Sequence, residues 1–199
     1  MERLNSLLVL EKLKKKNINI FTIFDFQRVF DTKYESAKKS VLRYTKSGLF
    51  TKAKKGLYFL SNNPPNDFEI ANKLYQPSYI SFETALSFYN IIPETIFEIT
   101  SATPRISRSF LVNNLKFSYK KIKKEYFFGY TPKKIKNRTV LVAEPEKALI
   151  DFLYFVSLKK RDMSYERIDL KKIKKQKLIK YSKRFNDKKI IKLTREFYD

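Results

Sequence analysis

The first sixty residues contain three stretches of helical apolar spacing followed by two short strand-like runs, and this order allows few folds. The first helix is predicted from four leucines that lie three residues apart on one face: Leu4, Leu7, Leu10 and Leu13. Residues 17–20 break the pattern. A second helix is expected over residues 22–30, with Thr22 as its N-cap and Phe26 one turn before Phe30.

The third helix has the clearest boundaries. Thr32 and Glu35 have the spacing of a capping box, and Gly48 stands where helices commonly end, so we expect a helix over residues 33–47. Its inward face is predicted from residues spaced three or four apart: Tyr34, Ala37, Val41 and Tyr44. The opposite face carries hydroxyl and cationic side chains: Lys33, Ser36, Lys39, Ser40, Arg43 and Lys46.

A basic hairpin is expected directly after this helix. Residues 49–50 and Leu57–Leu60 are strand-like, and the turn over residues 51–56 carries Lys52, Lys54 and Lys55. Three helices followed by such a ribbon are the order of a winged helix-turn-helix, in which the third helix lies in the major groove of DNA. The alternatives are a helix with a solvated charged face and a solvated loop.

Charge is distributed in blocks. The chain has 43 Lys and Arg against 20 Asp and Glu, a net charge of +23. The net charge is +9 over residues 1–60, −4 over 61–100, +8 over 101–157 and +10 over 158–199. A compositional bias toward lysine would not leave an acidic block between basic ones. Nucleic acid is therefore the expected partner.

The absence of Cys and His excludes whole classes of chemistry. Disulfides, the usual structural zinc sites, thiol nucleophiles and imidazole bases all need one of these residues. We expect no cofactor and no metal. No apolar run approaches 18 residues and no signal-type segment is present, so we expect a soluble cytoplasmic protein without membrane contact.

A polar stretch with two prolines, residues 61–66, separates two domains. We expect residues 1–60 to bind DNA, residues 61–76 to form a linker with a short helix, and residues 77–199 to form a mixed α/β domain with a basic helical tail. The protein is thus expected to be α+β.

Local patterns predict the elements of the second domain. Strand-like segments are residues 96–101, 109–112, 115–119, 126–130 and 139–143. Asn113 and Asn114 are expected to form a two-residue turn, and Ser81 to cap a helix. Pro145 opens a strongly apolar helix. Residues 133–138 are expected to be a loop, and Asn186 with Asp187 to separate two helices of the tail.

Several stretches resemble one known family. They are residues 77–86 (PSYISFETAL), 92–94 (IPE), 99–103 (ITSAT), 127–130 (FFGY) and 143–151 (AEPEKALID). The N-terminal part, with KKGLY at residues 54–58, is also similar. Together these stretches, which span roughly residues 5–160 in the same order, resemble the AbiEi family of transcriptional regulators, the antitoxin half of an abortive-infection toxin–antitoxin system.

The resemblance implies a two-domain antitoxin. Its winged domain would bind inverted repeats in its own promoter and repress the operon. Its second domain would oppose a nucleotidyltransferase-like toxin without a stable complex, and would have DNA contacts of its own. A dimer and two monomers on one palindrome are both open.

A second basic surface is suggested by cations of the second domain: Arg105, Arg108, Lys120, Lys121, Lys123 and Lys124. They either contact a flank of the duplex or form a solvated basic turn, and the same two interpretations apply to residues 133–138. Lys120 and Lys121 cannot share one face of a strand, because successive side chains alternate.

The alternative to a repressor is a metal-dependent nuclease or another nucleic-acid-processing protein. The clustered acids that it would use are Glu144, Glu146 and Asp151. These residues open a helix and lack the spacing of a restriction-type nuclease, and Asp151 is expected to be exposed or hydrogen-bonded. An RNA-binding or adaptor module is a third class, although the aromatic sheet pattern of an RNP motif is absent.

Overall fold

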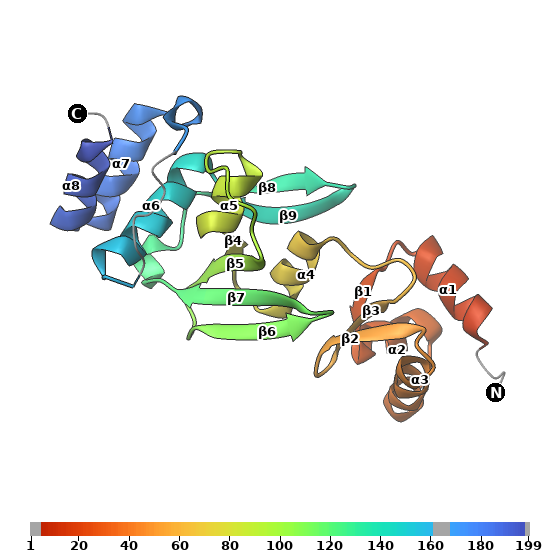
Figure 1. Ribbon diagram of the computed structural model, residues 1–199. Coiled ribbons are helices and arrows are strands. Elements are labelled where there is room, and N and C mark those ends of the chain that lie inside the picture. The colour runs from red at the N-terminus through yellow and green to blue at the C-terminus, as the bar shows by residue number, and fades with distance from the viewer. Residues whose placement is uncertain (1–4, 161–167, 198–199) are drawn as a thin grey trace. The chain divides into compact units, whose positions relative to one another are not determined.

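The computed structural model describes residues 5–160 and 168–197, which form eight α-helices and two sheets (Figure 1). The chain is an α+β protein, as expected. It divides into two compact units, Met1–Leu74 and Tyr75–Asp199. Leu4, the first leucine of the predicted N-terminal stripe, lies outside the described residues.

Unit 1 contains one three-stranded antiparallel sheet. Its elements are α1 (Ser6–Lys15), β1 (Ile20–Thr22), α2 (Ile23–Phe30), α3 (Tyr34–Lys46), β2 (Phe50–Lys54), β3 (Leu57–Leu60) and α4 (Asp67–Leu74). The strands lie in the order β1-β3-β2. The predicted hairpin is confirmed, but residues 51–54 belong to β2 and not to its turn. The predicted break over residues 17–20 ends at the first residue of β1, a strand that was not predicted. Its pairing with β3 is a long-range contact, which a local sequence pattern does not indicate.

Two helix starts in unit 1 test the predicted caps. Thr22 is the N-cap of α2, where its backbone N–H donates to Asp25 Oδ2 at 2.9 Å and its Oγ1 accepts from Asp25 N at 3.1 Å. The predicted capping box at Thr32 is wrong. Asp31 closes α2 in the left-handed conformation with φ +46°, and α3 starts one residue later with Lys33 as N-cap and no side-chain cap.

The core of unit 1 is largely aromatic. The ring centres of Phe21 and Phe50 are 4.9 Å apart, and those of Tyr44 and Phe50 are 5.4 Å apart. The predicted pair of Phe26 and Phe30 is in contact, with 4.3 Å between ring centres. These rings join α2, α3 and β2, so the position of α3 depends on aromatic packing.

The buried face of α1 differs from the predicted leucine stripe. Val9 and Leu13 are fully buried, whereas Leu7 is 64% exposed. The three-residue spacing of the leucines drifts around a helix of 3.6 residues per turn, and packing selects the residues four apart.

Unit 2 is a six-stranded mixed sheet with helices. Its elements are β4 (Tyr79–Ile80), α5 (Phe82–Phe88), β5 (Glu98–Thr103), β6 (Arg108–Val112), β7 (Leu115–Lys121), the 3₁₀ turn η1 (Lys124–Tyr126), β8 (Tyr130–Ile135), β9 (Arg138–Ala143), α6 (Pro145–Ser157), η2 (Leu170–Lys172), α7 (Lys175–Phe185) and α8 (Lys188–Glu196). The strand order is β6-β7-β5-β4-β9-β8. In Figure 1, α5 and α6 lie beside the middle of this sheet, and α6 also contacts α7 and α8.

Most local predictions for unit 2 are confirmed. Asn113 and Asn114 form the predicted turn with φ of +48° and +63°, and α6 begins at Pro145. Asn186 ends α7 in the left-handed conformation, and Asp187 caps α8. The tail is therefore helical over the part that the structure describes, while residues 161–167 and 198–199 fall outside it.

Three predictions for unit 2 differ from the structure. Residues 126–129 are not a strand, because Tyr126 ends η1 and packs its ring on Phe185 with 4.1 Å between centres, and only Tyr130 belongs to β8. Residues 133–138 are not a loop but the β8–β9 hairpin. Ser81 occupies the N-cap position of α5, but its side chain accepts no cap bond and its hydroxyl donates to another group inside unit 2.

The acceptor of that hydroxyl is Asp151, which forms a fully buried ion pair with Lys147 inside unit 2. Ser81 Oγ donates to Asp151 Oδ2 at 2.7 Å, and Tyr79 Oη donates to the same oxygen at 2.9 Å. Lys147 Nζ contacts the other oxygen, and both side chains of the pair are 0% exposed. Burial lowers the pKa of Lys147 and raises that of Asp151, and each partner's charge opposes this change.

The aliphatic stem of Lys147 needs the glycine that faces it. A Cβ on Gly129 would lie 3.1 to 3.2 Å from the Cβ, Cγ and Cδ atoms of Lys147, and the φ of Gly129 is +70°. The ring of the next residue, Tyr130, stacks on Tyr79 with 4.5 Å between centres. The resembling stretches 77–86, 127–130 and 143–151 thus meet around one ion pair.

We predict that Lys147→Met destabilises the protein by about 3–5 kcal/mol, because it leaves the Asp151 carboxyl group buried without its partner. The measurement is the free energy of unfolding in urea. The double variant Lys147→Met/Asp151→Leu is the control, and we expect it to recover most of the loss. Equal losses in both variants would contradict a cost that arises from the unpaired charge.

Candidate nucleic-acid interface

The connection between α2 and α3 presents one face of α3 to solvent. Only three residues, 31–33, separate the two helices, and α3 buries Ala37, Val41 and Tyr44 against the core. Gly48 follows the end of α3 with φ +78°, as predicted. The inward stripe of α3 is confirmed except that Tyr34 is only half-buried, packed 4.9 Å from the ring of Phe24.

The polar face of α3 carries all six predicted side chains. Lys33, Lys39, Arg43 and Lys46 are exposed, and Ser36 and Ser40 are half-buried. The guanidinium of Arg43 lies 4.9 Å from the ring centre of Tyr44, and Arg43 Nη2 is 3.2 Å from Tyr44 Oη. This contact holds the stem of Arg43 against the helix, so the side chain is oriented before any partner arrives.

One candidate on α3 was missed by sequence reasoning. Leu42 is 45% exposed and borders the polar face beside Lys39 and Lys46. An exposed apolar side chain at this place suits the methyl group of thymine. Its position outside the inward stripe was the available signal.

The hairpin presents two of its three lysines. Lys52 and Lys55 are exposed, and Lys55 lies in the turn before Gly56. Lys54 is half-buried, and its ammonium donates to the carbonyl of Leu74 at 2.5 Å. A bulge between Lys52 and Lys54 sets the two side chains in different surroundings.

Of the six cations predicted to form a second basic surface, only some lie close together. Arg105 and Arg108 both lie over the ring of Tyr75, at 4.6 and 5.7 Å from its centre. In the sheet register Lys120 is paired with Ala102 and Lys121 with Thr103. The side chains of these two successive residues therefore point to opposite faces of the sheet. Lys123 lies beside Glu125, and Lys124 opens η1. The six residues therefore do not form one surface.

The three acids of the nuclease alternative are held by their own chain. Lys177 Nζ lies 2.8 Å from Glu144 Oε1 and 3.6 Å from Glu146 Oε2. Glu146 also accepts from the backbone N–H of Lys174 at 3.0 Å. Asp151 is bound as described above and is not exposed. Among the described residues no three acidic side chains come together as a metal site.

Glu144 and Glu146 connect the start of α6 with α7 through their contacts with Lys177 and Lys174. Burial disfavours the Glu144 carboxylate, but hydrogen bonds from Lys177 and Tyr181 outweigh this effect and lower the pKa of Glu144. Burial, together with the charges of Glu144 and Glu146, raises the pKa of Tyr89 to about 12. The geometry of this cluster is that of a structural clamp.

The chain matches no protein-family model, and it is significantly similar to no curated protein. Within residues 5–160 and 168–197, every helix is too short or too polar to cross a lipid bilayer.

We predict that Lys177→Gln lowers the free energy of unfolding by about 1 kcal/mol at pH 7. Because the pKa of Glu144 is lowered in the folded state, this contribution exists above the unfolded pKa and is lost as the pH falls through the folded pKa. The difference between variant and wild type, measured in urea at pH 7 and pH 3, should therefore shrink at pH 3. Lys180→Gln, an exposed change on α7, is the control, and a difference independent of pH would be the contrary result.

Proposed function

We propose that residues 6–60 form a winged helix-turn-helix and that the protein is a sequence-specific repressor that binds double-stranded DNA. The observation that carries this proposal is the polar face of α3, on which four cations, Lys33, Lys39, Arg43 and Lys46, are exposed to solvent, next to a hairpin that exposes Lys52 and Lys55. Glu35, in the first turn of α3, lies 3.8 Å from Lys38 on the flank of the helix.

The side chains divide by chemistry into two tasks. A lysine ammonium is a compact charge that suits phosphate, whereas the planar guanidinium of Arg43 can donate two hydrogen bonds to guanine O6 and N7. We assign Arg43 to base contact and Lys39, Lys46, Lys52 and Lys55 to the backbone. Affinity would then be strongly salt-dependent, and specificity would depend on few residues.

The antitoxin role rests on the resemblance to the AbiEi family. In the structure, three of the resembling stretches of unit 2 meet around the Lys147–Asp151 pair. The proposed operator is an inverted repeat in the protein's own promoter. The proposed functional partner is a nucleotidyltransferase-like toxin, opposed without a stable complex.

We predict that Arg43→Ala weakens binding to a duplex from the region upstream of its own reading frame by about 1–3 kcal/mol and relaxes specificity at one base pair. Lys39→Gln should instead reduce the slope of log K against log salt by about one unit and leave sequence preference unchanged. Gel-shift titrations at several salt concentrations measure both effects.

Lys38→Gln is the matched control, because Lys38 is exposed on α3 but lies beside Glu35 and away from the polar face. We expect it to bind nearly as wild type. If an Arg43→Ala/Lys39→Ala variant bound the duplex with wild-type affinity, α3 would not be part of the interface and the repressor proposal would be wrong.

The antitoxin role predicts a separation of functions. Co-expressed with a nucleotidyltransferase-like protein encoded beside it, the wild-type chain should restore growth. Arg43→Ala/Lys39→Ala should lose repression of a promoter fusion and still restore growth. Failure of the wild-type chain to restore growth would argue against an antitoxin and leave the DNA-binding proposal intact.

A further inference from the structure

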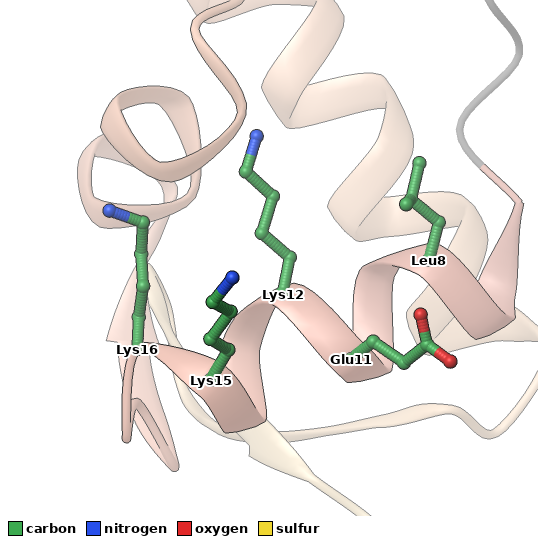
Figure 2. A pocket seen from close by; sticks show the side chains of 5 residues that line it. All are labelled: Leu8, Glu11, Lys12, Lys15 and Lys16. Atoms are coloured by element: carbon green, nitrogen blue, oxygen red, sulfur yellow. The ribbon is translucent and has the colours of Figure 1, made fainter.

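A hollow of about 670 Å³ opens along one side of α1, outside the surface assigned to DNA so far. Among the described residues it is lined by four residues of α1 and by the residue that follows it: Leu8, Glu11, Lys12, Lys15 and Lys16. Their spacing of three and four places them on adjacent turns of one helix face (Figure 2). Three of the five are lysines, so the hollow is cationic.

The lysines of this hollow have no acidic partner among the described residues. Lys15 and Lys16 are exposed and Lys12 is half-buried, and none of the three forms an ion pair with any of these residues. Figure 2 shows Lys12 and Lys16 extending to the same side of α1. The carboxylate of Glu11 is directed away from their ammonium groups, toward the N-terminal end of the helix. Neighbouring unpaired ammonium groups repel one another, and an anion between them would remove that cost.

The position of Lys12 connects the hollow to the start of α3. Its Nζ lies 5.1 Å from the ring centre of Phe30, the last residue of α2. After the three residues 31–33, α3 begins at Tyr34, and the N-terminal part of a recognition helix is the part that contacts base edges. A duplex on α3 therefore passes close to the end of α2, where Lys12 stands.

We propose that Lys12, Lys15 and Lys16 bind phosphates of the DNA backbone beside the groove that α3 enters. This inference rests on the proposed function and extends the interface to α1. A DNA duplex carries one negative charge per about 1.7 Å of its axis, so several phosphates fall within the length of two turns of the α-helix α1. Leu8 lies toward the N-terminal end of the hollow, and the three lysines are its cationic donors among the described residues.

The test compares two triple variants of the full chain with equal changes in net charge. Lys12→Gln/Lys15→Gln/Lys16→Gln removes the cluster. Lys14→Gln/Lys159→Gln/Lys160→Gln removes three exposed lysines elsewhere, and Lys14 lies on the same helix outside the hollow. Each is titrated against the upstream duplex and against a random duplex of equal length between 50 and 200 mM salt, with circular dichroism to verify folding.

We expect the cluster variant to bind about 10- to 100-fold more weakly at low salt and to reduce the salt slope by about two to three units on both duplexes. Sequence preference should be unchanged, because phosphate contacts carry no base information. The control should keep nearly the wild-type slope. Equal losses in both variants would reduce the effect to net charge and overturn the proposal, as would a wild-type slope in the cluster variant.

Inorganic phosphate distinguishes the source of the anion. If inorganic phosphate binds in the hollow at low millimolar concentration and does not compete with the duplex, the hollow binds a free anion. The assignment of its lysines to phosphates of the DNA backbone is then wrong. If instead Arg43→Ala/Lys39→Ala and the cluster variant both bind as wild type, the proposed function itself fails. Loss in the α3 variant alone refutes only the role of α1.

Discussion

The buried pair of Lys147 and Asp151 is the interaction on which unit 2 depends. Removing two charges from water costs several kcal/mol per ion, and their attraction repays this only when the remaining hydrogen-bonding positions are filled. Tyr79 and Ser81 fill those of the carboxylate, and the rings of Phe128 and Phe185 lie 5.0 and 4.8 Å from the ammonium. The pair itself lies on α6, and these partners come from β4, the N-cap of α5, the residues that precede β8, and α7, so the pair connects all of these segments.

The core of unit 1 is joined by the rings of Phe21, Phe26, Phe50 and Tyr44 and contains no ion pair of the kind found in unit 2. Most lysines of α1, α3 and the hairpin are exposed, whereas Lys12 and Lys54 are half-buried. These elements can therefore each present cations to a polyanion. In unit 2, by contrast, Glu144 and Glu146 interact with Lys177 and with the backbone N–H of Lys174, so these acids connect the start of α6 with α7.

Elements whose boundaries are set by neighbours in sequence were predictable. Gly48, the turn at Asn113 and Asn114, and Pro145 at the start of α6 all act within one turn of backbone, and each behaves as predicted. The misses share a long-range cause. Residues 126–130 look strand-like, but Tyr126 packs on Phe185, almost sixty residues away. Ser81 occupies the N-cap position of α5, but its side chain is oriented to donate to the Asp151 carboxylate, seventy residues away, and makes no cap bond.

The sequence by itself determined the α+β class, the inward stripe of α3 and the sign of its opposite face, because helical periodicity and charge are local properties. Only the tertiary structure decided which cations are available. Lys52 and Lys54 are two residues apart and equivalent in any sequence pattern. A bulge separates them in the folded strand, where Lys54 donates to the carbonyl of Leu74 and Lys52 stays exposed. In the sequence, Lys12, Lys15 and Lys16 only complement the dipole at the end of α1. The folded chain places Lys12 over the ring of Phe30, the last residue of α2, and that proximity is a product of packing alone.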